Sequence, residues 1–147
     1  MLYFAYGSNM ERVQMNRLCP GSRFVSTAKL KDYELAFTEM STSWGGGVAD
    51  LRPAKGKVVE GVLWEITDTD LKALDDYEGY PSAYIRKSMT VEKPSGERVT
   101  AIAYFVAKPG REYVPSKRYM RTLIQGAEEH DLSPEYIAFL EKVKTTG

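Results

Sequence analysis

The sequence has only one histidine and one cysteine among 147 residues, which limits the chemistry that its side chains can supply. Catalytic triads and Cys–His pairs need an imidazole beside the nucleophile. His130 lies at the expected C-terminal end of a helix, where a capping or surface role is typical. Cys19 has no activating neighbour in the sequence. A lone cysteine forms no internal disulfide, so we expect a reducing compartment and a cytoplasmic location.

Metal-ligand spacings, phosphate-binding glycine motifs and an excess charge are also missing. No His, Cys or carboxylate pattern resembles a metal site, so we expect no metal and no cofactor. Twenty basic residues balance twenty acidic ones, which argues against a dedicated nucleic-acid or membrane-surface protein. No apolar run approaches the roughly 20 residues of a membrane span, and residues 2–6 are too few for a signal peptide.

The pattern of residues that is present predicts a single domain over 1–147, of the α+β class. We expect a small mixed β-barrel or sheet with peripheral helices. Predicted strands cover 2–6, 23–30, 33–38, 48–51, 58–66, 84–93 and 98–107, with a glycine-rich loop at 41–47. Predicted helices cover 10–18 and 68–77, and two more follow Ser116 and Ser133.

Several helix ends carry recognisable signals. Asn9 is positioned to cap the first helix. Thr67 and Asp70 have the spacing of a capping pair, and Gly79 is the expected terminator of the helix that they begin. Ser133 is followed by proline, which suits the first position of the last helix.

The acidic segment 75–78 is the first candidate for chemistry. Asp75, Asp76 and Glu78 fall in the last turn of the predicted helix, where the helix dipole disfavours negative charge. Asp75 and Glu78 share a face and should repel each other, which raises the pKa of at least one carboxyl. Flanking tyrosines would add burial. Glu78 is therefore a candidate general base, and a solvated acidic helix end is the alternative.

A second candidate is the turn Gly7-Ser8-Asn9, between the first strand and the first helix. Backbone N–H groups at such a turn can hold a carboxylate or phosphate, although an ordinary capped turn has the same sequence. A third segment, 111–121, mixes arginine and lysine with tyrosine. It is typical of a solvated helix face, and a role in an anionic pocket or in nucleic-acid binding stays open.

Together these segments resemble the γ-glutamylcyclotransferase family, and the resemblance runs in order through most of the chain. The matching segments are residues 3–9, 44–49, 61–64, 74–79 with Tyr84, and 115–119 with 126–127. Ser8-Asn9 is similar to the branch that acts on γ-glutamyl amino acids. The resemblance implies a small mixed β-barrel in which Glu78 is the single catalytic residue. The substrate-binding residues that it suggests are Tyr6, Gly7, Ser8, Asn9, Met10, Trp44, Gly45, Tyr84 and Tyr119.

The implied reaction converts a γ-glutamyl amide into 5-oxoproline and a free amine or amino acid. The small-molecule substrate attacks its own carbonyl through its α-amine, so the protein needs no nucleophile. A homodimer is an open possibility. The alternatives are an enzyme for γ-glutamylamines or a γ-glutamylated biosynthetic intermediate, and a non-catalytic module that binds an anionic metabolite.

Overall fold

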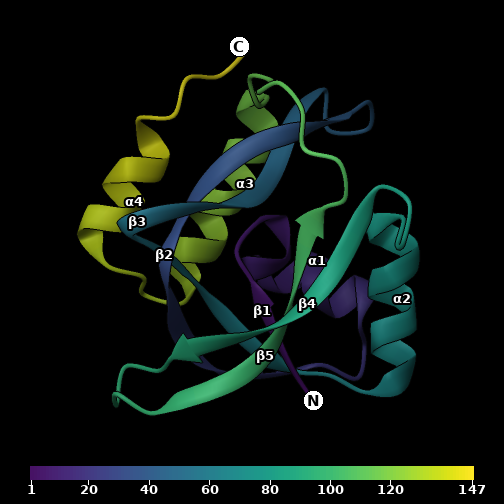
Figure 1. Ribbon diagram of the computed structural model, residues 1–147, viewed down its shortest axis with the longest axis vertical. Coiled ribbons are helices and arrows are strands. Elements are labelled where there is room, and N and C mark those ends of the chain that lie inside the picture. Colours follow the sequence, from purple (N-terminus) through teal and green to yellow (C-terminus); the bar gives the residue numbers. More distant parts are fainter.

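Five strands close into a small mixed barrel in the computed structural model, which describes residues 1–147 (Figure 1). The strands are β1 (Leu2–Ala5), β2 (Arg23–Ser41), β3 (Gly46–Glu65), β4 (Tyr84–Glu92) and β5 (Arg98–Val106). They follow one another around the barrel in the order β1, β3, β2, β4, β5. Neighbours are antiparallel except at the closure, where β1 runs parallel to β5. The predicted α+β barrel is confirmed.

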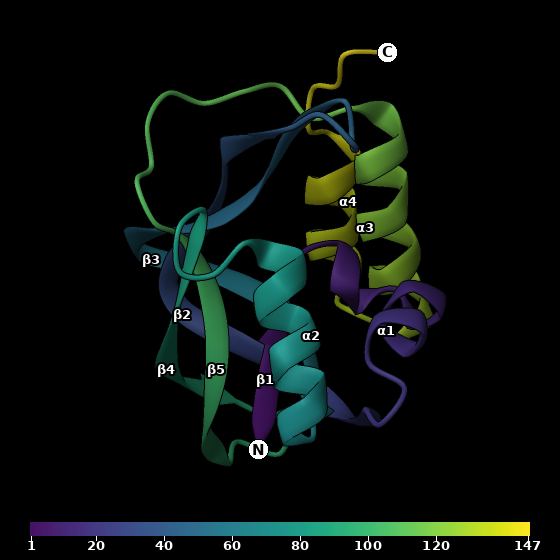
Figure 2. The same cartoon turned by 90° about the vertical axis from the view of Figure 1, so that its right-hand side faces the viewer.

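Four α-helices surround the barrel: α1 (Arg12–Leu18), α2 (Asp68–Glu78), α3 (Lys117–Glu129) and α4 (Pro134–Glu141). A short 3-10 helix, η1 (Ser8–Met10), directly follows β1 and packs against α3. Figure 2 shows α3 and α4 together along one side of the molecule. No helix combines the length and apolar composition that crossing a bilayer would require.

Strands β2 and β3 form one long hairpin, where the sequence suggested four separate strands. Asp32 (φ 66°) and Gly56 (φ 84°), which fall between the predicted strands, lie opposite each other at a shift in register between Lys31 and Tyr33. The Asp32 carboxylate accepts a hydrogen bond from the Gly56 N–H at 3.0 Å. The two residues therefore form an irregularity within the β2–β3 pairing, which continues on both sides of it. The predicted breaks were wrong because a bulge bends a strand without ending it.

The prediction that Asn9 caps the first helix was also wrong. Residues 8–10 form the 3-10 turn, and α1 begins only at Arg12. Its cap is Glu11, whose carboxylate accepts from the N–H groups of Val13 (2.6 Å) and Gln14 (3.1 Å). A carboxylate can cap a helix as well as an amide can, and the Asn9 side chain is engaged elsewhere.

Helix α2 begins and ends as predicted. The Thr67 hydroxyl accepts from the Asp70 N–H at 3.0 Å, and the Asp70 carboxylate accepts from the Thr67 N–H at 3.1 Å. Gly79 takes the left-handed conformation (φ 73°) that terminates the helix. Asp70 also accepts from the N–H of Gly21 at 3.2 Å, which ties α2 to the segment after α1. These bonds fix the helix whose last residue is Glu78.

We predict that Asp70→Ala lowers the free energy of unfolding by about 1–3 kcal/mol, because two backbone donors lose their acceptor around a side chain that is 2% exposed. Urea unfolding followed by circular dichroism would measure the change. Asp68→Ala is the matched control: Asp68 is exposed in the same helical turn and should contribute less than about 1 kcal/mol. Equal losses in both variants would contradict the assignment.

Candidate active site

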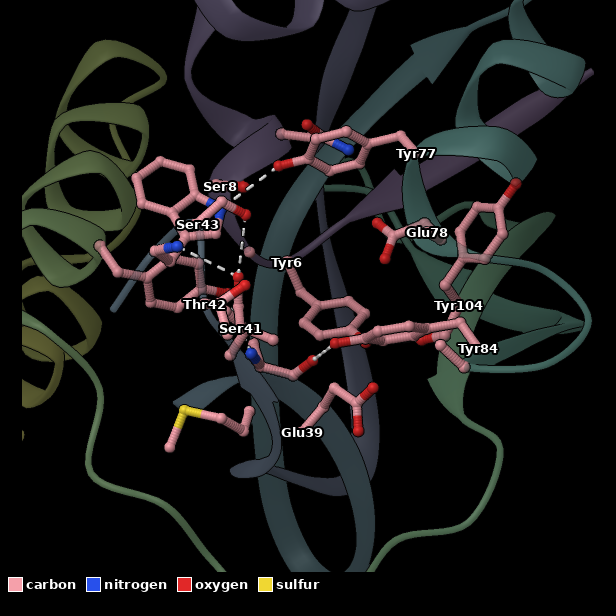
Figure 3. A pocket seen from close by; sticks show the side chains of 18 of the residues that line it. Tyr6, Ser8, Glu39, Ser41, Thr42, Ser43, Tyr77, Glu78, Tyr84 and Tyr104 are labelled. Carbon is pink, nitrogen blue, oxygen red and sulfur yellow. Dashed lines mark hydrogen bonds between the residues drawn. The ribbon is translucent and has the colours of Figure 1, made fainter. Parts of the chain in front are cut away.

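A cavity of about 290 Å³ opens at one end of the barrel, where β1 ends and the β2–β3 hairpin turns back (Figure 3). It brings Glu78 together with seven other residues that the sequence singled out: Tyr6, Gly7, Ser8, Asn9, Trp44, Tyr84 and Tyr119. Met10 and Gly45 are not among the lining residues. The Met10 side chain is fully buried in the core behind the turn.

Glu78 faces this cavity without a partner. It is the last residue of α2, and its carboxylate makes no hydrogen bond or ion pair within the protein. The residue is only partly exposed, and it lines the cavity. Burial raises the pKa of Glu78 from the ordinary 4.5 to about 8. A carboxyl with this pKa exchanges protons readily near neutral pH.

The cause of the raised pKa differs from the one expected. Asp75, whose repulsion was predicted to act on Glu78, is held in a network of its own: Arg86 donates to it at 2.9 and 3.1 Å, and the Tyr104 hydroxyl donates at 2.6 Å. Burial would raise the pKa of Asp75, but these hydrogen bonds keep it below the usual value. Asp75 is therefore the paired carboxylate of the segment and Glu78 the unpaired one.

Six tyrosines line the cavity, and burial raises the pKa of five of them: Tyr3, Tyr6, Tyr84, Tyr104 and Tyr119. All five therefore stay neutral. They differ in whether the hydroxyl proton is already used, which decides what each can offer to a bound molecule.

Three of these hydroxyls donate to the protein itself. Tyr6 donates to the Tyr104 carbonyl, Tyr84 to the Ala49 carbonyl at 3.0 Å, and Tyr104 to Asp75. The other two accept: Tyr3 from the Asn9 amide at 3.0 Å and Tyr119 from the Ala49 N–H at 2.9 Å. The proton of Tyr119 is not used in any hydrogen bond within the protein. The hydroxyl also lies beside the turn, since a Cβ added at Gly7 would be 3.2 Å from the Tyr119 oxygen. Tyr119 is thus a hydrogen-bond donor facing the Gly7–Asn9 turn.

The turn is held rigidly from behind. The Trp64 indole N–H donates to the Asn9 carbonyl at 3.1 Å, and the Asn9 amide donates to the Tyr3 hydroxyl at 3.0 Å. Gln14 donates to both the Ser8 hydroxyl (2.7 Å) and the Asn9 side chain (2.9 Å). The turn is therefore fixed before any ligand binds, which spares a ligand the entropy of ordering it.

Helix α3 closes the back of the same turn. A Cβ at Gly126 would lie 2.8 Å from atoms of Met10 and Glu11, so only glycine allows this approach. The His130 ring lies 3.0 Å from the Met10 carbonyl through Nε2 and stacks on Phe24 at 4.8 Å. His130 is at the end of α3, as expected, and it contacts the back of the turn and not the cavity.

Trp44 and Tyr77 close one side of the cavity. The Trp44 indole N–H donates to the Tyr77 hydroxyl at 3.3 Å, and its ring meets Tyr119 edge-on at 5.2 Å. Since Tyr77 extends from α2 and Trp44 from the tip of the β2–β3 hairpin, this contact joins the two elements that frame Glu78.

Sequence reasoning missed Tyr3, Tyr104 and Glu39 as lining residues. Tyr104 had a signal, because a phenol in an otherwise apolar central strand needs a polar partner for its hydroxyl. Glu39 had a weaker one, a charge at the end of an apolar strand segment. No group of three or more His, Cys, Asp or Glu side chains is arranged to hold a metal ion.

Comparison with known proteins identifies the family of this chain. The family model described as "Gamma-glutamyl cyclotransferase, AIG2-like" matches residues 3–121. The γ-glutamylcyclotransferase of Bos taurus is 32% identical over 97% of this chain and 78% of its own length, and that of Homo sapiens is 31% identical over the same shares.

Solved structures give the same result. A structure named γ-glutamyl cyclotransferase superposes with a TM-score of 0.94 at 30% identity, over 100% of this chain and 91% of its own. An AIG2-like protein from Mus musculus, at 22% identity and a TM-score of 0.60, shares the fold over 74% of this chain. From the family match and these relatives, the chain belongs to the γ-glutamyl cyclotransferase, AIG2-like family.

Proposed function

We propose that this enzyme releases 5-oxoproline from γ-glutamyl amides and that Glu78 is its general acid and base. The observation that carries the proposal is the unpaired Glu78 carboxyl, which faces the cavity and has a pKa of about 8. Relatives named γ-glutamylcyclotransferase support the activity. A cytoplasmic location and a homodimer stay predictions from the sequence.

The reaction needs little from the protein besides proton transfer and a folded substrate. The substrate's α-nitrogen attacks its own γ-carbonyl carbon, so a C–N bond forms in the five-membered ring while the amide C–N bond breaks. No water or protein nucleophile enters, which agrees with a cavity that lacks histidine and cysteine. Holding the substrate in its ring-closing conformation can contribute roughly 7–11 kcal/mol to lowering the barrier.

Proton balance explains why one carboxylate suffices. An α-amine has a pKa of about 8 and begins largely as an ammonium with three protons. The ring nitrogen of the product keeps one, and the departing amine leaves as an ammonium after gaining the other two. Glu78 accepts a proton from the attacking nitrogen and delivers it to the leaving nitrogen, once for each transferred proton. The pKa of Glu78, about 8, is close to that of the amine, so neither transfer is steeply uphill.

The turn at Gly7-Ser8-Asn9 and the hydroxyl of Tyr119 would hold the remaining charges. The turn offers backbone N–H groups to the substrate's α-carboxylate or to the developing oxyanion. Tyr119 adds a hydroxyl proton that the protein leaves unused. Because Trp64 and Gln14 fix the turn, these donors are oriented in advance, as electrostatic stabilisation of a transition state requires.

We predict that Glu78→Gln reduces 5-oxoproline formation by at least about 100-fold, because an amide of the same shape cannot carry the proton. Mass spectrometry of 5-oxoproline, with a γ-glutamyl dipeptide as substrate, would measure the rate. Asp76→Asn is the matched control, since Asp76 is exposed two residues earlier and should leave the rate unchanged. Wild-type turnover by Glu78→Gln would remove Glu78 from the mechanism.

A pH profile tests the same carboxyl in the unaltered enzyme. Only ionised Glu78 can accept a proton, so kcat/KM should fall about ten-fold for each pH unit below an apparent pKa near 8. In kcat the corresponding limb should lie at lower pH, because the bound ammonium favours the ionised carboxylate. Initial rates in a constant-ionic-strength buffer series would measure both. A kcat/KM that stays flat through this range would mean that another group limits the reaction.

Stability should respond to pH in the opposite sense. The folded protein holds a proton on Glu78 that the unfolded chain releases above pH 4.5, so stability from this group is lost as pH rises from 4.5 to about 8. Glu78→Gln lacks this loss. Its stability relative to wild type should therefore increase by up to about 1.4 kcal/mol per pH unit across that window. Urea unfolding at several pH values would measure the difference, and a constant difference would contradict burial of the carboxyl.

A further inference from the structure

The cavity contains a second carboxylate, Glu39, for which the mechanism above has no use. Glu39 lies near the end of β2 and lines the cavity together with Glu78, yet it makes no hydrogen bond or ion pair with its side chain. Figure 3 shows Glu39 and Glu78 on opposite sides of Tyr84. Glu39 is close enough to Tyr84 to make the last of five contributions that raise the pKa of that phenol, after burial, Glu78, Tyr119 and Asp50.

An irregularity in the hairpin accompanies the position of Glu39. The β2–β3 register shifts between Ala36 and Glu39, and within this shift the Thr38 hydroxyl donates to the buried Asp50 at 2.8 Å. Such bulges change the direction in which the following side chains point. Elsewhere on the same strand Glu34 has an ordinary surface role, because it pairs with Arg52 at 3.0 Å. Glu39 thus differs from Glu34, because its carboxylate faces the cavity and has no ion-pair partner.

No positive charge in the cavity offsets these two carboxylates. None of the lining residues is lysine, arginine or histidine. The basic group at the rim, Arg118, is exposed and engaged on the hairpin, where it donates to the Ser43 carbonyl and stacks 4.5 Å above the Trp44 ring. Arg86 is bound by Asp75. A substrate therefore meets a cavity that is lined by two carboxyl groups and by no basic side chain.

We propose that Glu39 selects γ-glutamyl amides whose leaving amine carries a positive charge at its distal end, in preference to those that carry a carboxylate there. This inference rests on the proposed 5-oxoproline-forming activity. Glu78 exchanges protons with both reacting nitrogens, so Glu39, on the other side of Tyr84, is the carboxylate left to face the distal part of the departing amine. An ammonium would satisfy its unpaired oxygens, whereas a carboxylate would be repelled in a partly desolvated site.

Three substrates whose departing amines each contain four carbons test this selection: the γ-glutamyl amides of 1,4-diaminobutane, n-butylamine and 4-aminobutanoate. Their glutamyl halves are identical, so interactions at the turn and at Glu78 cancel in the comparison. Wild-type kcat/KM should be highest for the cationic amide, with the neutral one about ten-fold lower, the contribution of one charge-assisted hydrogen bond. The anionic amide should be lowest, and added salt should narrow the differences.

Variants assign the selection to Glu39. Glu39→Gln should give similar kcat/KM values for the cationic and neutral amides. Glu39→Lys should give a higher kcat/KM for the anionic amide than for the cationic one. Glu34→Gln is the matched control on the same strand and should keep the wild-type order. Circular dichroism and thermal melting would establish that each variant is folded, and kcat/KM for the neutral amide is the reference to which the two charged amides are compared within each variant.

The outcomes separate this inference from the proposed function. If wild type forms 5-oxoproline from all three amides at equal kcat/KM, or prefers the anionic one, charge selection by Glu39 is wrong while the cyclotransferase activity stands. If Glu39→Gln keeps the wild-type order, another group makes the selection and Glu39 is excluded. If wild type forms 5-oxoproline from a γ-glutamyl dipeptide but from none of the three amides, the inference is wrong and the proposed function stands. If it forms 5-oxoproline from neither, both fail.

Discussion

The unpaired carboxyl of Glu78 is the constraint on which the functional end of this molecule depends. Burying a carboxylate without a partner is unfavourable, and proteins usually answer by pairing it or by neutralising it. Both outcomes, pairing and neutralisation, occur within the last turn of α2. Asp75 is paired with Arg86 and Tyr104, whereas Glu78 is left to hold a proton near neutral pH. Because Asp75 takes the available arginine, the pKa of Glu78 remains high enough for proton exchange.

The barrel turns this local arrangement into a site. Closure of β1 against both β3 and β5 fixes where the first strand ends, and thus where the Gly7–Asn9 turn lies relative to α2. The long β2–β3 hairpin then reaches over that end, and its tip contacts α2 through Trp44 and Tyr77. Three segments far apart in the sequence therefore meet around one carboxyl, and each is fixed by hydrogen bonds that do not involve a ligand.

The features that could be predicted from the sequence are those that depend on residues close together in the chain. The capping pair Thr67 and Asp70 and the terminator Gly79 act within a few residues, and all three were correct. The cap of the first helix was missed because Asn9 bonds to Tyr3 across the turn, a contact that no local pattern reveals. The pairing of Asp75 with Arg86 likewise joins α2 to β4. Sequence spacing therefore located the acidic segment, but it named repulsion by Asp75 as the cause of a raised pKa where burial raises the pKa of Glu78.

The wall of the cavity explains why a single titrating group can control the chemistry. Buried tyrosines stay protonated, so they shape and hydrogen-bond without competing for protons. Three of them have already donated their hydroxyl protons to the protein, whereas Tyr3 and Tyr119 accept hydrogen bonds and keep their protons, with Tyr119 beside the turn. In the mechanism that we propose, proton transfer is thus confined to Glu78, and charge recognition is the role of Glu39 on the other side of Tyr84. The same barrel can therefore change its preference for the departing amine at β2 without altering the group that moves protons.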